Sequence, residues 1–154
     1  MFASSTIDIS IMSNKIEKVI LFQIEQTSKA SKIYSQREFD RLGVDITVEQ
    51  WIILKIIDEH PEISQKELAE KSLRDPASIT RTLDLLQKKG LIDRMAIPGN
   101  RRQYQLILTN AGKKLIVTYL PIVEEHRKRS TAGLSKKEIN KLSELLLKMQ
   151  ENMR

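Results

Sequence analysis

The chain has 154 residues, of which 40% are hydrophobic and 30% are charged, and this length suits one domain with a real core rather than two large ones. It contains no cysteine, which excludes disulfide bonds, thiolate nucleophiles, cysteine metal sites and thiol-based redox sensing. No apolar run approaches the roughly 20 residues that a membrane span needs, and the first dozen residues lack the pattern of a secretory signal, so we expect a cytoplasmic protein.

The formal net charge of +6 is concentrated in residues 64–108. That segment holds nine Lys or Arg residues against five acidic ones, a net charge of +4 that leaves only +2 for the rest of the chain. A concentration of positive charge suits a polyanionic partner. The distribution therefore indicates a localised anion-binding surface within this segment.

Two helices are predicted before the basic segment. The first is amphipathic, begins at Ser13 or Asn14, and runs to about Leu42, where Gly43 ends it. A capping-box pattern over residues 47–50 begins the second helix. We expect the second helix to be well buried through its apolar residues Val48, Trp51, Ile52, Leu54 and Ile56.

Two shorter helices follow in close succession. A second capping box, over residues 64–67, begins a helix that ends by Ser72. Asp75 and Pro76 form the N-cap and the first helical position of the next helix, which Gly90 ends. The helix that begins at Pro76 has two contrasting faces. Its apolar face carries Ile79, Leu83 and Leu86, and its opposite, polar face carries Ala77, Arg81, Asp84 and Lys88.

The periodicity then changes from helical to alternating, which predicts strands over residues 91–96 and 103–108. The intervening residues 97–102 contain a turn-forming Pro-Gly and place two basic residues at the tip of a hairpin, Arg101 and Arg102. Two helices with a three-residue connection (72–74), followed directly by a basic hairpin, constitute a winged helix-turn-helix.

Two further helices complete the chain. Thr109 caps the first, in which Pro121 predicts a kink, and a third capping box over residues 135–138 begins the last helix. The last helix carries an apolar stripe of Ile139, Leu142, Leu145, Leu146 and Met149. The apolar stripes of the first and last helices exceed what one small core covers, so we expect a homodimer, with packing of these helices within one chain as the alternative.

The predicted fold class is therefore mainly α with a small β wing (α+β). We expect residues 1–46 to form an N-terminal arm and dimerisation helix, residues 47–108 a winged helix-turn-helix DNA-binding domain, and residues 109–154 the C-terminal dimerisation helices.

The order of these elements predicts how double-stranded DNA is recognised. A helix that enters the major groove by its N-terminus offers backbone N–H groups to phosphate and its first outward side chains to base edges. Arg81 is the main candidate for base readout, and the arginines of the hairpin fit the narrow minor groove, where they add affinity more than sequence choice. The predicted DNA-binding residues are Ser64, Gln65, Ala77, Ser78, Thr80, Arg81, Lys88, Arg101 and Arg102.

Four segments together resemble the MarR family of bacterial regulators: residues 68–71 (Leu-Ala-Glu-Lys), 75–81 (Asp-Pro-Ala-Ser-Ile-Thr-Arg), 86–92 (Leu-Gln-Lys-Lys-Gly-Leu-Ile) and 108–112 (Leu-Thr-Asn-Ala-Gly). The resemblance spans nearly the whole chain. It implies an obligate dimer whose terminal helices interlock, two winged modules on successive half-sites of a pseudo-palindromic operator, and repression as the default mode. It also implies a small-molecule effector bound between the dimer helices and the DNA module.

Carried over by position, the resemblance matches Ser78, Thr80 and Arg81 to the recognition-helix contacts of the family, and Arg101 or Arg102 to its wing arginine. Asn100 departs from the pattern, because the family wing commonly has Asp there. This departure puts an Asp–Arg tether inside the wing in doubt.

Other functions find little support in the sequence. Trp51, Tyr34 and Arg37 are candidates for the lining of an effector cleft, but a Trp on an apolar helix face is typical of a core, so no ligand-binding residue is assigned. The histidines, His60 and His126, have no metal-ligand spacing, and there is no glycine-rich phosphate loop. We therefore predict no enzyme, metal or cofactor.

The remaining alternative is a winged-helix module that binds only protein, because a fold does not fix a function. Arg81 and Lys88 on the exposed helix face favour DNA over this alternative.

Overall fold

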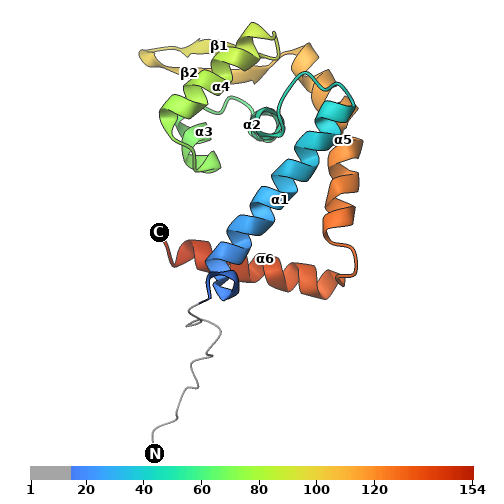
Figure 1. Cartoon of the computed structure of the whole chain (residues 1–154). Coiled ribbons are helices and arrows are strands. Elements are labelled where there is room, and N and C mark those ends of the chain that lie inside the picture. Colours follow the sequence, from blue (N-terminus) through green and yellow to red (C-terminus); the bar gives the residue numbers. More distant parts are fainter. Residues whose placement is uncertain (1–14) are drawn as a thin grey trace, which may run out of the picture. The chain divides into compact units, whose positions relative to one another are not determined.

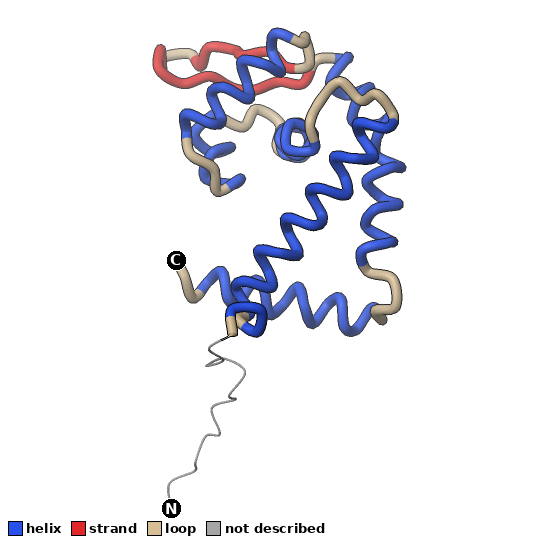
Figure 2. Tube along the Cα trace, in the orientation of Figure 1, coloured by secondary structure: helices blue, strands red, loops and turns tan. Residues whose placement is uncertain are grey.

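The computed structural model describes residues 15–154, with the backbone alone at residues 100–103. Six α-helices and a two-stranded antiparallel sheet follow a short 3-10 helix at Ile16–Lys18 (Figures 1 and 2). The predicted class, mainly α with a small β wing, is confirmed. The elements are α1 (Ile20–Arg41), α2 (Val48–Glu59), α3 (Gln65–Ser72), α4 (Pro76–Lys88), β1 (Ile92–Ile97), β2 (Asn100–Leu108), α5 (Asn110–Ser130) and α6 (Lys136–Glu151).

The chain divides into two compact units, Met1–Ile116 and Val117–Arg154. The first contains the helices α1 to α4, the β1–β2 hairpin and the start of α5, and the second contains the rest of α5 and α6. Among residues 15–154, no helix combines the length and the apolar content of a membrane span.

The core of the first unit gathers apolar side chains from α2, α3, α4 and both strands. Trp51 is 3% exposed, as expected for a core residue, and the predicted inner face of α4 is fully buried. Full burial of such a side chain contributes roughly 1.5–3 kcal/mol. The side chains with no exposed surface are Ile53, Leu54, Leu68, Ile79, Leu83, Leu86, Ile92 and Leu106.

The helix starts are those that the capping patterns predict. Thr47, Ser64 and Ser135 each accept a hydrogen bond from the backbone three residues on, and the Gln or Glu at that position accepts one from the capping residue's own N–H. Asp75 caps α4 by accepting from the backbone of Ser78 at 2.8 Å, and Thr109 Oγ1 accepts from Gly112 N–H at 3.1 Å. Local side-chain chemistry alone therefore fixes these boundaries.

Other boundaries differ from the prediction. Helix α1 begins at Ile20 and not near Ser13 or Asn14, because Val19 has extended backbone angles after the 3-10 turn; the predicted start itself lies outside the described residues. The connection between α3 and α4 is Leu73–Asp75, one residue later than predicted, and it turns through Leu73, whose φ of 51° is left-handed.

The hairpin turn is shorter than expected. Strand β1 extends to Ile97 and β2 begins at Asn100, so only Pro98 and Gly99 form the loop, and Gly99 supplies the positive φ of 80° that a two-residue loop needs. The register jumps between the pairs Ile97↔Asn100 and Ala96↔Tyr104, so residues 101–103 bulge from β2. The prediction that Arg101 and Arg102 belong to the turn is therefore wrong; their backbone lies in β2, next to the tip.

The start of α5 packs closely against the end of the α4–β1 connection. A Cβ on Gly112 would overlap the carbonyl oxygen of Leu91 and would lie 3.1 Å from Leu108 Cδ2. That carbonyl is itself held, because it accepts a hydrogen bond from Thr109 N–H at 3.2 Å. Glycine at position 112 thus permits the close approach of the two segments.

We predict that Gly112→Ala destabilises the protein by about 1–3 kcal/mol, because the added methyl group meets backbone that cannot move away. Helix propensity alone predicts the opposite sign, a gain of about 0.5–1 kcal/mol. Urea unfolding measures the difference, with Lys113→Ala at the adjacent exposed position as the control. A Gly112→Ala protein as stable as the wild type would show that the contact is not tight.

An ion-pair network ties α1 to the helix-turn-helix. The carboxylate of Glu49 on α2 forms ion pairs with Lys32 Nζ of α1 and with Arg74 Nη1 of the α3–α4 connection, each at 3.0 Å. The Arg74 side chain is 21% exposed, and the hydrogen bonds from Arg74 and Lys32 hold the pKa of Glu49 below its ordinary value. One carboxylate therefore joins three segments that are distant in sequence.

We predict that Glu49→Gln lowers the free energy of unfolding at neutral pH by about 0.5–1 kcal/mol, a small effect because solvent screens a half-exposed group. Because the folded-state pKa of Glu49 is depressed, its contribution is complete above the ordinary glutamate pKa and disappears as the pH falls through the lowered value. Unfolding at a series of pH values should therefore show the wild type and the variant converging in acid.

The control for this experiment is Glu25→Gln, which removes an exposed pair with Lys29 within α1. It should change the stability very little at any pH. A deficit of Glu49→Gln that stays constant into acid would mean that the loss does not come from the charge.

Candidate nucleic-acid interface

Helix α4 presents a polar face to solvent. Its apolar face is fixed in the core, so Ala77, Thr80, Arg81 and Lys88 are exposed and Ser78 is partly exposed. The helix begins with Pro76, which has no N–H to leave unsatisfied, and the Asp75 cap engages the N–H of Ser78. The outward side chains that the sequence predicts for base contact thus lie on the free face of one helix.

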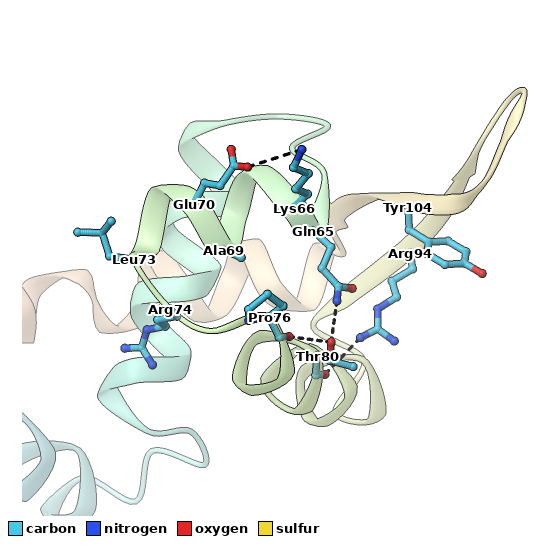
Figure 3. Close-up of a pocket in the computed structure, with 10 residues that line it drawn as sticks. All are labelled: Gln65, Lys66, Ala69, Glu70, Leu73, Arg74, Pro76, Thr80, Arg94 and Tyr104. Carbon is cyan, nitrogen blue, oxygen red and sulfur yellow. Dashed lines mark hydrogen bonds and ion pairs between the residues drawn. The ribbon is translucent and has the colours of Figure 1, made fainter. Parts of the chain in front are cut away.

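Two of the predicted DNA-binding residues contact each other. Gln65 Nε2 on α3 donates to Thr80 Oγ1 at 2.8 Å, and that hydroxyl donates to the carbonyl oxygen of Pro76 at 2.9 Å (Figure 3). The Thr80 hydroxyl therefore uses its proton within α4 and accepts from α3. The bond fixes the first residue of α3 against the middle of α4.

Ser64, one of the predicted DNA-binding residues, has a structural role at the start of α3. It is 9% exposed, and its hydroxyl accepts from Glu67 N–H as the N-cap of α3. It also forms a bridge with Gln105 of β2, while Leu106 N–H donates to the carbonyl of Ile63 at 3.0 Å. These bonds attach the start of α3 to the hairpin.

The nine basic residues of segment 64–108 differ in whether a carboxylate forms an ion pair with them. Of the seven whose side chains the structure describes, four are joined to carboxylates: Lys66 to Glu70 (3.8 Å), Arg74 to Glu49 (3.0 Å), Lys89 to Asp45 (2.6 Å) and Arg94 to Asp84 (2.7 Å). Within residues 15–154, no carboxylate lies at ion-pair distance from Lys71, Arg81 or Lys88. The positive charge available on α4 is therefore that of Arg81 and Lys88.

The hairpin lies beside α4, with β1 packed against it (Figure 1). The backbone of Arg101 and Arg102 lies in β2, and their side chains are outside the described set. Their predicted role in the minor groove stays a prediction.

A cavity of about 950 Å³ is bounded by α3, its connection to α4, α4 itself and the hairpin (Figure 3). Ala69, Leu73 and Pro76 contribute apolar surface to it. The other lining residues are Gln65, Lys66, Glu70, Arg74, Thr80, Arg94 and Tyr104. The sequence does not single out this cavity, because its walls come from four elements.

The sequence also gives no sign of the role of Arg94. It counts there as one more surface cation, yet its side chain is 19% exposed and bound to α4. No spacing rule identifies the pair with Asp84, because a helix residue and a strand residue meet only in the folded unit.

In the described part of the chain, no three His, Cys, Asp or Glu side chains gather as a metal site would require.

The chain is similar to known transcription regulators. Residues 46–104, which include α2, α3, α4 and most of the hairpin, match the sequence model of the MarR family. A MarR family transcriptional regulator from Listeria monocytogenes, solved in complex with a 26mer DNA, is 28% identical and aligns with a TM-score of 0.78 over 86% of this chain and 87% of that chain.

The transcriptional regulator SlyA is 27% identical, with a TM-score of 0.78 over 87% of this chain and 93% of that one. A mutant MarR from E. coli, complexed with operator DNA, shares the fold at 24% identity, with a TM-score of 0.77 over 89% of this chain and 99% of that one. The helix-turn-helix with its attached hairpin, the family match and these neighbours agree: residues 46–104 are a MarR family domain, and the chain has the fold of MarR family winged-helix transcription regulators.

Proposed function

We propose that this protein is a cytoplasmic, homodimeric and ligand-responsive repressor that binds a pseudo-palindromic operator in double-stranded DNA. Helix α4 enters the major groove, and the hairpin reaches the adjacent minor groove. The observation that carries the proposal is the free polar face of α4, on which Arg81 and Lys88 have no carboxylate at ion-pair distance within residues 15–154. In this proposal residues 47–108 are the DNA-binding domain, between dimerisation segments 1–46 and 109–154.

Each exposed residue of the surface has a role that its chemistry allows. Arg81 donates two hydrogen bonds to guanine, and Ala77 permits close approach to the bases. Lys88 and the hairpin residues Arg101 and Arg102 neutralise phosphate or occupy the minor groove. Gln65, Ser78 and Thr80 supply further polar contacts, and Ser64 acts by positioning the start of α3.

The dimer is supported by apolar surface that one chain leaves open. Helix α6 buries none of its residues, and Leu142, Leu145 and Leu147 are 51%, 46% and 56% exposed. On α1, Ile20 and Leu21 are 51% and 53% exposed. Surface of this kind on long helices is typical of a subunit interface, and a two-fold dimer presents two copies of α4 to a two-fold symmetric site.

The cavity beside α4 supports the response to a ligand. A small molecule there would touch Thr80 and Arg94, and so would alter the elements that hold α4 in place. An effector cleft between the dimer helices and the DNA module stays a prediction from the family resemblance.

A titration of the dimer with the duplex upstream of its own gene tests the DNA part of the proposal. We expect this duplex to bind at least a thousandfold more tightly than a shuffled duplex of the same composition, and both affinities to fall as salt rises. Equal affinity for the two duplexes, or a flat salt dependence, would support the alternative of a protein-binding module.

The side-chain roles predict different signatures for two arginine variants. Arg81→Ala should weaken operator binding by about 1–3 kcal/mol and relax the preference at one base pair per half-site. Arg101→Ala should weaken all duplexes alike and lower the salt dependence by about one charge. The matched control is Arg37→Ala, an exposed arginine on α1. Identical losses on operator and shuffled DNA for both variants would contradict this assignment.

The dimer predicts that Leu145→Glu shifts the protein to single chains, because a carboxylate in an apolar interface loses its hydration. Sedimentation velocity measures the mass. Lys137→Glu introduces the same side chain at an exposed position of α6 that already carries a charge, and it should leave the dimer intact. A wild type that sediments as one chain, or a Leu145→Glu protein that remains dimeric, would contradict the interface.

A further inference from the structure

In addition to the packing of β1 against α4, one arginine of the hairpin forms polar contacts with α4. Arg94 lies on β1, and its Nη1 pairs with Asp84 Oδ1 of α4 at 2.7 Å, while its Nη2 lies 3.4 Å from the carbonyl oxygen of Thr80. Figure 3 shows the Arg94 side chain extending from the sheet towards α4. At the same place on α4, the Thr80 hydroxyl accepts a hydrogen bond from Gln65 of α3. Residues from α3, α4 and β1 thus meet around Thr80.

Arg94 is poorly placed to act as a contact for phosphate. Its side chain is 19% exposed, and its Nε is buried without a hydrogen-bond partner among the described residues. A guanidinium that is mostly withdrawn from solvent and already bound to a carboxylate has little charge left to offer an external anion. Arg94 therefore does not belong with Arg81 and Lys88, although all three count equally in the sequence.

Asp84 is an anomaly on the surface that the proposed function assigns to DNA. It lies three residues after Arg81 and four before Lys88, and its side chain is 57% exposed. A carboxylate on this helix repels the phosphate backbone and lowers affinity for every sequence. Its pairing with Arg94 provides a reason for its presence that ordinary surface solvation does not.

We propose that Asp84 and Arg94 are positioning residues that set the hairpin at a fixed orientation to α4, so that major-groove and minor-groove contacts are made in one register. Neither contacts a base. The pair contributes to discrimination between sequences, because base contacts require both elements to fit one duplex, whereas contacts with phosphate tolerate misalignment. This inference rests on the proposed function, DNA binding by α4 and the hairpin.

The test uses a substitution for which electrostatics and positioning predict opposite results. Asp84→Asn removes a negative charge from the proposed DNA surface, so electrostatics alone predicts tighter binding to operator and shuffled duplexes alike. Loss of position predicts that the ratio of operator to shuffled affinity falls about tenfold, the size of one lost base-pair contact, while shuffled affinity rises or stays constant. Fluorescence anisotropy with both duplexes measures the two affinities on the full-length protein.

Two companion variants make the result specific. Asp93→Asn makes the same charge change at the neighbouring exposed position of β1 and should leave the ratio unchanged. Asp84→Glu keeps a carboxylate for Arg94 and should retain the ratio within about threefold, on the scale of a weak polar contact. Thermal melting monitored by circular dichroism establishes that each variant is folded, which is expected because Asp84 is half-exposed.

The outcomes separate this inference from the function on which it rests. A wild-type protein that does not distinguish operator from shuffled DNA contradicts the proposed function, and the inference with it. A wild type that discriminates, with Asp84→Asn raising both affinities equally as Asp93→Asn does, overturns the positioning role alone. A folded Asp84→Asn protein that loses discrimination, while Asp84→Glu keeps it, supports that role.

Discussion

The arrangement of the winged helix-turn-helix depends on the burial of one face of α4. Ile79, Leu83 and Leu86 have no exposed surface, and together their burial contributes on the order of 5–9 kcal/mol. A rotation of α4 about its axis would bring these side chains into water and carry Arg81 and Lys88 into the core, which is strongly unfavourable. The hydrophobic face therefore determines which side chains solvent, and in our proposal DNA, can reach.

Polar interactions then set the orientations of neighbouring elements that hydrophobic packing leaves undetermined. Gln65 binds the Thr80 hydroxyl, and Arg94 binds Asp84 and approaches the Thr80 carbonyl, so α3 and β1 each hold the same stretch of α4. A further ion-pair network, centred on Glu49, joins α1 to the connection before α4. Exposed ion pairs contribute little to stability, so their main effect here is directional: they define orientations that apolar contacts alone leave loose.

Charge in this protein is informative only after pairing is known. The excess of basic residues in residues 64–108 overlaps the segment that matches the family model, but four of the seven cations whose side chains the structure describes there are bound to carboxylates. Two of those carboxylates, Asp45 and Glu49, lie outside the segment, so a local charge count misses them. The sum over a segment measures its average field, whereas recognition depends on the cations that remain unpaired at the surface.

The sequence by itself determined the succession of elements and most helix starts, because a cap is a contact between residues three apart and an apolar face repeats with the helical period. It placed Ile79, Leu83 and Leu86 inside and Arg81 outside for the same reason. The tertiary structure decided the extent of the hairpin turn and the hydrogen bond between Gln65 and Thr80. It also decided the ion pairs of Arg94 with Asp84 and of Arg74 with Glu49. These features join residues of different elements, whose distances are set by the packing of the whole unit and leave no mark in local spacing.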